Sequence, residues 1–147
     1  MMLTYAKGID YPAIGVCVMC HDGKGKYLVG QRSPECKDEH FTWHPIGTGG
    51  IESHEAIPDA ARREVKEECG ADIIDMEFMG FREIFREHEG NKTHWIMFDY
   101  KARVDTEQVE IKEPDKCLEF RWCTVEEIPD PQHSTFPDFL KKYKDIL

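Results

Sequence analysis

Three glutamates, Glu64, Glu67 and Glu68, stand three and four residues apart in a segment that predicts a helix. At 3.6 residues per turn, their carboxylates project from one side of that helix within an arc of about 100°. The repulsion between the like-charged Glu64 and Glu68 costs about 0.2–0.5 kcal/mol. Glu67 and Glu68 also lie in the last turn before Gly70, where the negative end of the helix dipole favours cations. A hard divalent cation explains the cluster, because Mg²⁺ and Mn²⁺ prefer carboxylate oxygens and keep positions for water and phosphate.

The alternative is a solvated, charged helix face. Arg62, Arg63 and Lys66 lie among the acids, and Arg63 can pair favourably with Glu67 four residues on. For an isolated acidic triplet, such a solvated face is the commoner arrangement. The residues that precede the helix change this balance.

Residues 49–71 resemble the signature of the Nudix (MutT-type) hydrolases. The order is Gly49, five residues, Glu55, seven residues, Arg63-Glu64-Val65, one residue, Glu67-Glu68, one residue, Gly70 and Ala71. Every invariant Gly, Glu and Arg of that pattern is in place, and such rigid spacing is far more specific than a lone glycine motif. The chain departs from the pattern at Ala71, usually a bulky aliphatic, and at Gly47-Thr48-Gly49, where Pro-Gly-Gly is common.

The resemblance implies an α/β fold, the Nudix α/β/α sandwich with a central mixed β-sheet, as a single domain over residues 1–147. Members of the family use Mg²⁺ or Mn²⁺ and a water nucleophile to cleave a nucleoside diphosphate linked to another moiety. It also implies that Glu64, Glu67 and Glu68 are the metal ligands, and that Glu64 or Glu67 is the general base.

Other residues take supporting roles in this interpretation. Arg63 is the expected partner that orients the carboxylates, and Glu55 is a candidate for the same role. Gly49 and Gly50 allow the backbone to approach metal or phosphate closely. Arg32 resembles a family position that reaches phosphate, although a surface cation explains it equally well.

A later loop is expected to add one more acid in some family members. Glu113 is the candidate by its position relative to Glu119 and Trp122, and Glu110 competes with it. Because residues 104–116 contain several acids, a solvated loop is the alternative for both.

The elements that must position these residues can be predicted from local patterns. Apolar runs around a Gly-rich turn indicate a hairpin, and Ser33–Gly50 predicts a shaped loop. A helix is expected between Glu55 and Cys69, with Pro58 in its first turn and Gly70 ending it. Alternation indicates an antiparallel pair with Asp99 on its polar face. The expected elements are hairpin strands 13–20 and 27–32, paired strands 78–88 and 92–104, strand 118–123, a capped turn 124–128 and a closing helix 136–147.

Composition limits the partners. There are 29 acidic and 19 basic residues, a net charge of −10. The negative electrostatic field of such a chain repels nucleic acid polymers and anionic lipids unless a cation mediates. A small-molecule nucleotide is therefore the expected partner, with no nucleic acid polymer and no membrane; a homodimer stays open. The apolar content of 40% and the aromatic content of 11% exclude a wholly disordered chain.

The expected compartment is the cytoplasm. No stretch approaches the roughly 20 apolar residues of a membrane span, and Met1–Asp10 lacks the basic start and apolar run of a signal peptide. Without a secretory signal, the six cysteines are expected to be reduced thiols.

The substrate prediction rests on the segment after the signature. Residues 84–89 contain neither the Pro nor the Tyr of the branches that favour ADP-ribose or diadenosine polyphosphates. The run Glu113–Cys117, followed by Glu119 and Trp122, resembles the branch that converts nucleoside triphosphates, modified purines included, to monophosphate and pyrophosphate. The alternatives are an ADP-ribose or nucleotide-sugar pyrophosphatase and, from another class, a nucleotide-sensing domain without turnover.

Overall fold

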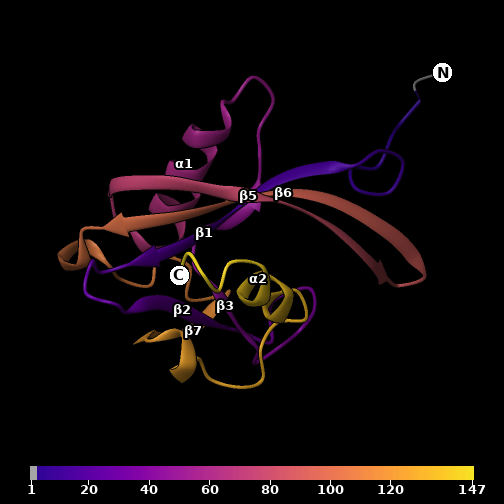
Figure 1. Ribbon diagram of the computed structural model, residues 1–147. Helices are drawn as coiled ribbons and strands as arrows, with labels where there is room; N and C mark the ends of the chain where they lie inside the picture. Colours follow the sequence, from indigo (N-terminus) through magenta and orange to yellow (C-terminus); the bar gives the residue numbers. More distant parts are fainter. Residues whose placement is uncertain (1–2) are drawn as a thin grey trace.

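Two long strands, β5 (Ile73–His88) and β6 (Asn91–Val104), form the predicted antiparallel pair. β5 begins five residues earlier than the sequence indicates. The computed structural model describes residues 3–147, so the expected domain range 1–147 begins two residues outside the described part. In Figure 1 the far end of this hairpin extends well beyond the rest of the sheet.

The sheet divides into two arms. β1 (Ala13–His21) runs parallel to β6, whereas it meets β2 (Tyr27–Arg32) at His21 and Tyr27, beside their turn. β4 (Thr48–Gly50) pairs with β1, and β3 (Trp43–Pro45) and β7 (Cys117–Cys123) pair with β2. One arm is therefore β4-β1-β6-β5 and the other β3-β2-β7, and they diverge beyond the β1–β2 turn (Figure 1). The predicted mixed sheet is confirmed.

The two helices, α1 (Ile57–Cys69) and α2 (Phe136–Lys142), lie on opposite sides of the β1-β6-β5 arm (Figure 1). α1 carries Pro58 in its first turn and ends at Gly70, whose φ of 74° is left-handed, as predicted. Each helix has its own buried cluster, with Val65 of α1 in one and Phe139 of α2 in the other. The α/β/α sandwich is therefore confirmed. α2 is shorter than expected; short 3-10 turns lie at Thr106–Gln108 and Val125–Glu127.

Two local expectations are wrong. The segment 33–50 is more than a loop, because it contains the three-residue strands β3 and β4. Asp99 does not face solvent: its side chain is 0% exposed. β6 has strands on both sides, and Phe139 of α2 helps to bury the second face, so both faces of β6 are buried at this point.

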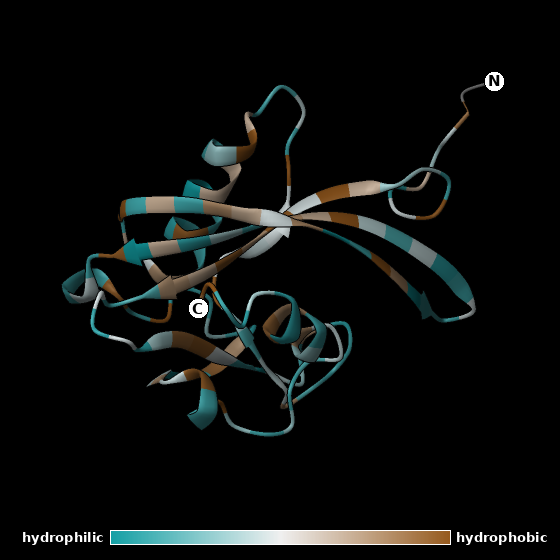
Figure 2. Ribbon diagram, in the orientation of Figure 1, coloured by the Kyte–Doolittle hydropathy of each residue, from teal (hydrophilic) through white to brown (hydrophobic). Residues whose placement is uncertain are grey.

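The hydropathy of the chain follows this arrangement. In Figure 2 apolar residues concentrate in β1, while the far end of the β5–β6 hairpin is more mixed. Phe78, Phe81 and Phe85 of β5 are more than half exposed. Within residues 3–147, neither helix has the length and apolar content needed to cross a membrane.

Candidate catalytic site

A cavity of about 400 Å³ is lined by residues of both arms of the sheet. Cys17 of β1 and Met97 of β6 belong to one arm, and Phe120 of β7 belongs to the other. Four carboxylates also line the cavity: Glu64, Glu67 and Glu68 of α1, and Glu113 from the segment before β7. The fold thus brings an acid from a separate loop to the three acids of the helix.

Glu68 is the acid that the backbone before α1 holds directly. Its Oε2 accepts hydrogen bonds from the backbone N–H groups of Gly47 and Thr48, both at 2.8 Å. Burial, followed by the negative charge of Glu64, raises the pKa of Glu68 to about 8 despite these donors. The departure from Pro-Gly-Gly matters here, because a proline at position 47 has no N–H to donate.

Glu64 and Glu67 share one nitrogen of Arg63. Arg63 Nη1 lies 2.9 Å from Glu64 Oε1 and 3.2 Å from Glu67 Oε2. Burial raises the pKa of Glu64, and the arginine opposes that shift. Glu67 is the more accessible acid, at 51% exposed against 13% for Glu64.

The rest of the Arg63 guanidinium is bound by the segment before α1. Its Nε and Nη2 donate to the two carboxylate oxygens of Glu55 at 2.7 and 2.9 Å, and Nη2 also donates to the carbonyl of Gly50 at 2.9 Å. These hydrogen bonds to Glu55 raise the pKa of Arg63. The guanidinium therefore fixes the two helix carboxylates relative to β4.

Gly49 lies directly against Glu64. A Cβ at this position would overlap the Glu64 carboxylate, so no other residue fits here without displacing it. The close backbone approach that the sequence predicts at Gly49 is therefore toward a carboxylate. Gly50 makes its contact through its carbonyl group, with Arg63.

Two basic side chains, Arg32 and Lys116, also line the cavity. Arg32, at the end of β2, is held by the carbonyl and carboxylate of Asp38 at 3.0–3.1 Å, and Lys116 Nζ lies 3.5 Å from Glu113 Oε2. His44 of β3 is also in the wall, and burial, followed by the charge of Arg32, lowers its pKa to about 3. At neutral pH this imidazole is uncharged, so the positive charge of the cavity wall comes from Arg32, Lys116 and Arg82.

Residues 11–143 match the NUDIX domain family. This chain belongs to the Nudix family. An uncharacterized Nudix hydrolase of Yersinia pestis is 31% identical over 125 residues, which are 84% of this chain and 65% of that protein. The chain thus spans about 65% of the length of that relative.

Solved structures show the same fold. The MutT NUDIX hydrolase from Burkholderia pseudomallei superposes with a TM-score of 0.77 at 21% identity, over 90% of this chain and 98% of that one. The MutT protein of Methanosarcina mazei Go1 gives 0.71 at 22% identity, over 93% and 96% of the two chains. The sequence resemblance to the Nudix family is therefore confirmed.

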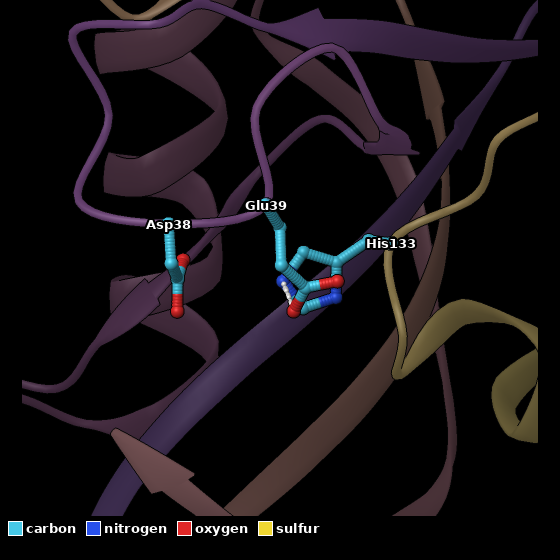
Figure 3. Close-up of side chains that lie close together, drawn as sticks. All are labelled: Asp38, Glu39 and His133. Atoms are coloured by element: carbon cyan, nitrogen blue, oxygen red, sulfur yellow. Dashed lines mark ion pairs between the residues drawn. The ribbon is translucent and has the colours of Figure 1, made fainter. Parts of the chain in front are cut away.

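A second acidic group of this Nudix domain lies outside the signature. Ligand atoms of Asp38, Glu39 and His133 lie within 4.8 Å of one another (Figure 3). However, Arg86 Nη2 already binds Asp38 and Glu39, at 2.8 and 2.5 Å, and His133 Nε2 lies 3.0 Å from Glu39. This group is an ion-pair network that joins the segment after β2 to β5 and to the segment before α2.

The Nudix cavity gathers most of the residues that the sequence singles out. Glu64, Glu67, Glu68, Glu113, Gly49 and Arg32 line it, and Glu55, Arg63 and Gly50 support them from behind. Glu110 does not line the cavity; it pairs with Lys112 at 2.8 Å on the surface.

Sequence reasoning missed Arg82, His133 and Lys116, which also line this cavity. They come from separate elements, so no spacing along the chain relates them to the signature. For Arg82 the available signal was the Arg-Glu repetition at residues 82–83 and 86–87, which places charged residues in an expected strand.

Proposed function

We propose that this chain is a divalent-metal-dependent hydrolase of nucleotides, which converts a nucleoside triphosphate, modified purine nucleotides included, to the monophosphate and pyrophosphate. The observation that carries the proposal is that one cavity holds four carboxylates, three from α1 and one from the segment before β7, together with the cations Arg32 and Lys116. Carboxylates suit a metal, and guanidinium and ammonium groups suit phosphate oxygens.

The donor set fits Mg²⁺ or Mn²⁺. Burial raises the pKa of both Glu64 and Glu68, and their mutual repulsion contributes at Glu68, so a cation would relieve charge that the protein only partly compensates. Glu64, Glu67, Glu68 and Glu113 would hold the ion. When bound, it supplies charge neutralisation for the phosphates and lowers the pKa of a water molecule.

The residues of this chain then divide the remaining work. Glu64 or Glu67 accepts the proton of the attacking water, and the exposure of Glu67 makes its carboxylate accessible to that water. Arg63 keeps both acids oriented through Nη1. Arg32 and Lys116 bind phosphate oxygens, so that water and the diphosphate are held together while one P–O bond forms and the anhydride P–O bond breaks.

The test is a substrate panel with resolved products. Purified protein is incubated with nucleoside triphosphates, ADP-ribose and nucleotide sugars in Mg²⁺ or Mn²⁺, and products are separated by ion-exchange chromatography. A triphosphate substrate is expected to yield monophosphate and pyrophosphate. Conversion of ADP-ribose to AMP and ribose phosphate instead would favour a pyrophosphatase, and binding without turnover would favour a nucleotide sensor.

Two variants assign the activity to the site. Glu67→Gln and Glu68→Gln keep side-chain volume but remove a charged ligand, so each is expected to abolish turnover with the circular dichroism spectrum unchanged. Glu110→Gln is the matched control, because Glu110 pairs with Lys112 and does not line the cavity. Full activity in the Glu67→Gln/Glu68→Gln double variant would overturn the proposal.

A further inference from the structure

Arg82 of β5 lies in the wall of the same cavity, and the proposed phosphate chemistry does not use it. Its Nε donates to Asp99 Oδ2 at 2.6 Å and its Nη2 to Asp99 Oδ1 at 2.9 Å. The guanidinium carbon lies 5.0 Å from the centre of the Phe139 ring of α2. The two-point ion pair and the aromatic ring together hold the guanidinium in one orientation.

The partner of Arg82 is itself fixed. Asp99 is fully buried, and Tyr143 Oη donates to its Oδ2 at 2.6 Å. A buried ion pair loses so much hydration that an apolar cluster of the same volume is often at least as stable. Stability alone therefore does not account for an oriented guanidinium at the cavity wall.

Arg82 has more hydrogen-bond donors than its protein partners use. Of the five N–H groups of an arginine, two bind Asp99 and one points to the Thr135 carbonyl at 3.4 Å. The other two have no acceptor among residues 3–147. The neighbouring wall residues Ile84 and Met97 are apolar, so this part of the cavity presents donors and apolar surface.

Arg82 and the strand that touches Glu64 lie at opposite edges of one sheet arm, in β5 and β4. The register connects them in three steps: Arg82 with Met97, Met97 with Gly15, and Gly15 with Gly50. Three strand spacings place the β5 and β4 backbones about 14 Å apart, and β4 is the strand that touches Glu64. A nucleotide whose phosphates lie at the carboxylates can therefore extend its base toward Arg82.

We propose that Arg82 is a specificity-determining residue that selects nucleobases with a carbonyl oxygen at the position where adenine and cytosine carry their amino group, namely 6-oxopurines and 4-oxopyrimidines. A guanidinium donates and never accepts. It binds such an oxygen, whereas the amino group of adenine or cytosine would leave donor facing donor. This inference rests on the proposed function in one respect, namely that a nucleotide occupies the cavity.

The test uses substrates that differ at one exocyclic group. ITP is compared with ATP and UTP with CTP for kcat/KM, and IMP is compared with AMP for affinity by calorimetry. A charge-assisted hydrogen bond predicts a preference for the oxo member of about tenfold or more in each pair. Ratios near one, or a preference for the amino member, would overturn the inference.

Variants assign the preference to Arg82. Arg82→Lys keeps a positive charge beside Asp99 but loses the forked donors, so the ratios are expected to fall toward one. The double variant Arg82→Met/Asp99→Asn removes both buried charges and serves the same purpose if the lysine variant does not fold. Tyr143→Phe is the matched control: it removes a hydrogen bond to Asp99 and leaves Arg82 in place, so a lower Tm with unchanged ratios is expected.

These results separate the two proposals. If no nucleotide is hydrolysed, the proposed function fails, while tighter binding of IMP than of AMP that is lost in Arg82→Lys still supports the role of Arg82. If triphosphates are hydrolysed but the ratios are the same in wild type and Arg82→Lys, the function stands and the role of Arg82 is overturned.

Discussion

Arg63 holds the carboxylate of Glu55 through two parallel hydrogen bonds, Nε to Oε2 at 2.7 Å and Nη2 to Oε1 at 2.9 Å. The same guanidinium reaches Glu64 and Glu67 with its third nitrogen. The segment before α1 and the acidic face of α1 are thus joined by one planar group. Since a planar fork cannot be replaced by a point charge, the geometry of the acids depends on arginine at this position.

Replacing Arg63 by lysine is therefore expected to lower kcat/KM by about 10–100-fold, as for other residues that orient metal ligands. Steady-state kinetics at saturating Mg²⁺ measures this effect. Arg62→Lys is the matched control, because Arg62 is exposed and pairs with Asp59 at 3.4 Å. Equal losses in both variants would contradict the orienting role of Arg63.

Adding a methyl group at Gly49 is expected to displace the Glu64 carboxylate, because a Cβ there overlaps it. Gly49→Ala should therefore weaken Mn²⁺ binding and turnover at least tenfold while the secondary structure persists. Calorimetric titration with Mn²⁺ and circular dichroism give the two readings. Wild-type metal affinity in Gly49→Ala would show that the carboxylate does not need its present position.

The contribution of Glu68 to the stability of the metal-free protein is expected to fall as pH rises from about 4.5 to 8. The folded-state pKa of Glu68 is raised from 4.5 to about 8, so its protonated form favours folding, and this contribution is lost as the pH rises through 8. Glu68→Gln mimics the protonated form at every pH. Its Tm in chelator should exceed that of wild type by about 5–10 °C at pH 8.5 and by much less at pH 4.5. Parallel curves of Tm against pH for the two proteins would refute the raised pKa of Glu68.

The Asp99–Tyr143 hydrogen bond is expected to stabilise the fold. Tyr143→Phe should lower the free energy of unfolding by about 1–3 kcal/mol, and Asp99→Leu by about 3–5 kcal/mol, because it leaves Arg82 buried without its partner. Urea denaturation measures both. Tyr5→Phe, at a residue that is 65% exposed, is the control and should change nothing measurable.

Metal binding should involve the α1 acids and not the ion-pair network of Asp38, Glu39 and His133. Glu67→Gln is expected to weaken Mn²⁺ binding, whereas Glu39→Gln should leave the stoichiometry and affinity unchanged, since Arg32 and Arg86 already pair with the two carboxylates of this group. Electron paramagnetic resonance of bound Mn²⁺ counts the sites. A site lost in Glu39→Gln would show that the network holds a cation.

The sequence by itself determined the features that depend on neighbours along the chain. Pro58 and Gly70 bound the helix through the missing N–H of one and the left-handed backbone of the other, and the 3.6-residue turn places Glu64, Glu67 and Glu68 on one side. The hairpin strands and the family signature are equally local.

Tertiary structure alone decided what lies opposite those acids. Asp99 alternates with apolar residues as a solvent-facing residue would, yet Phe139 of α2 and a strand on either side bury it, and Arg82 and Tyr143 become its partners. Arg82, which the sequence does not single out, and Glu113, which it offers as one of two candidates, reach the cavity from elements before and after β6. Their proximity follows from strand order and from the divergence of β1 and β2, which are long-range pairings that no local pattern encodes.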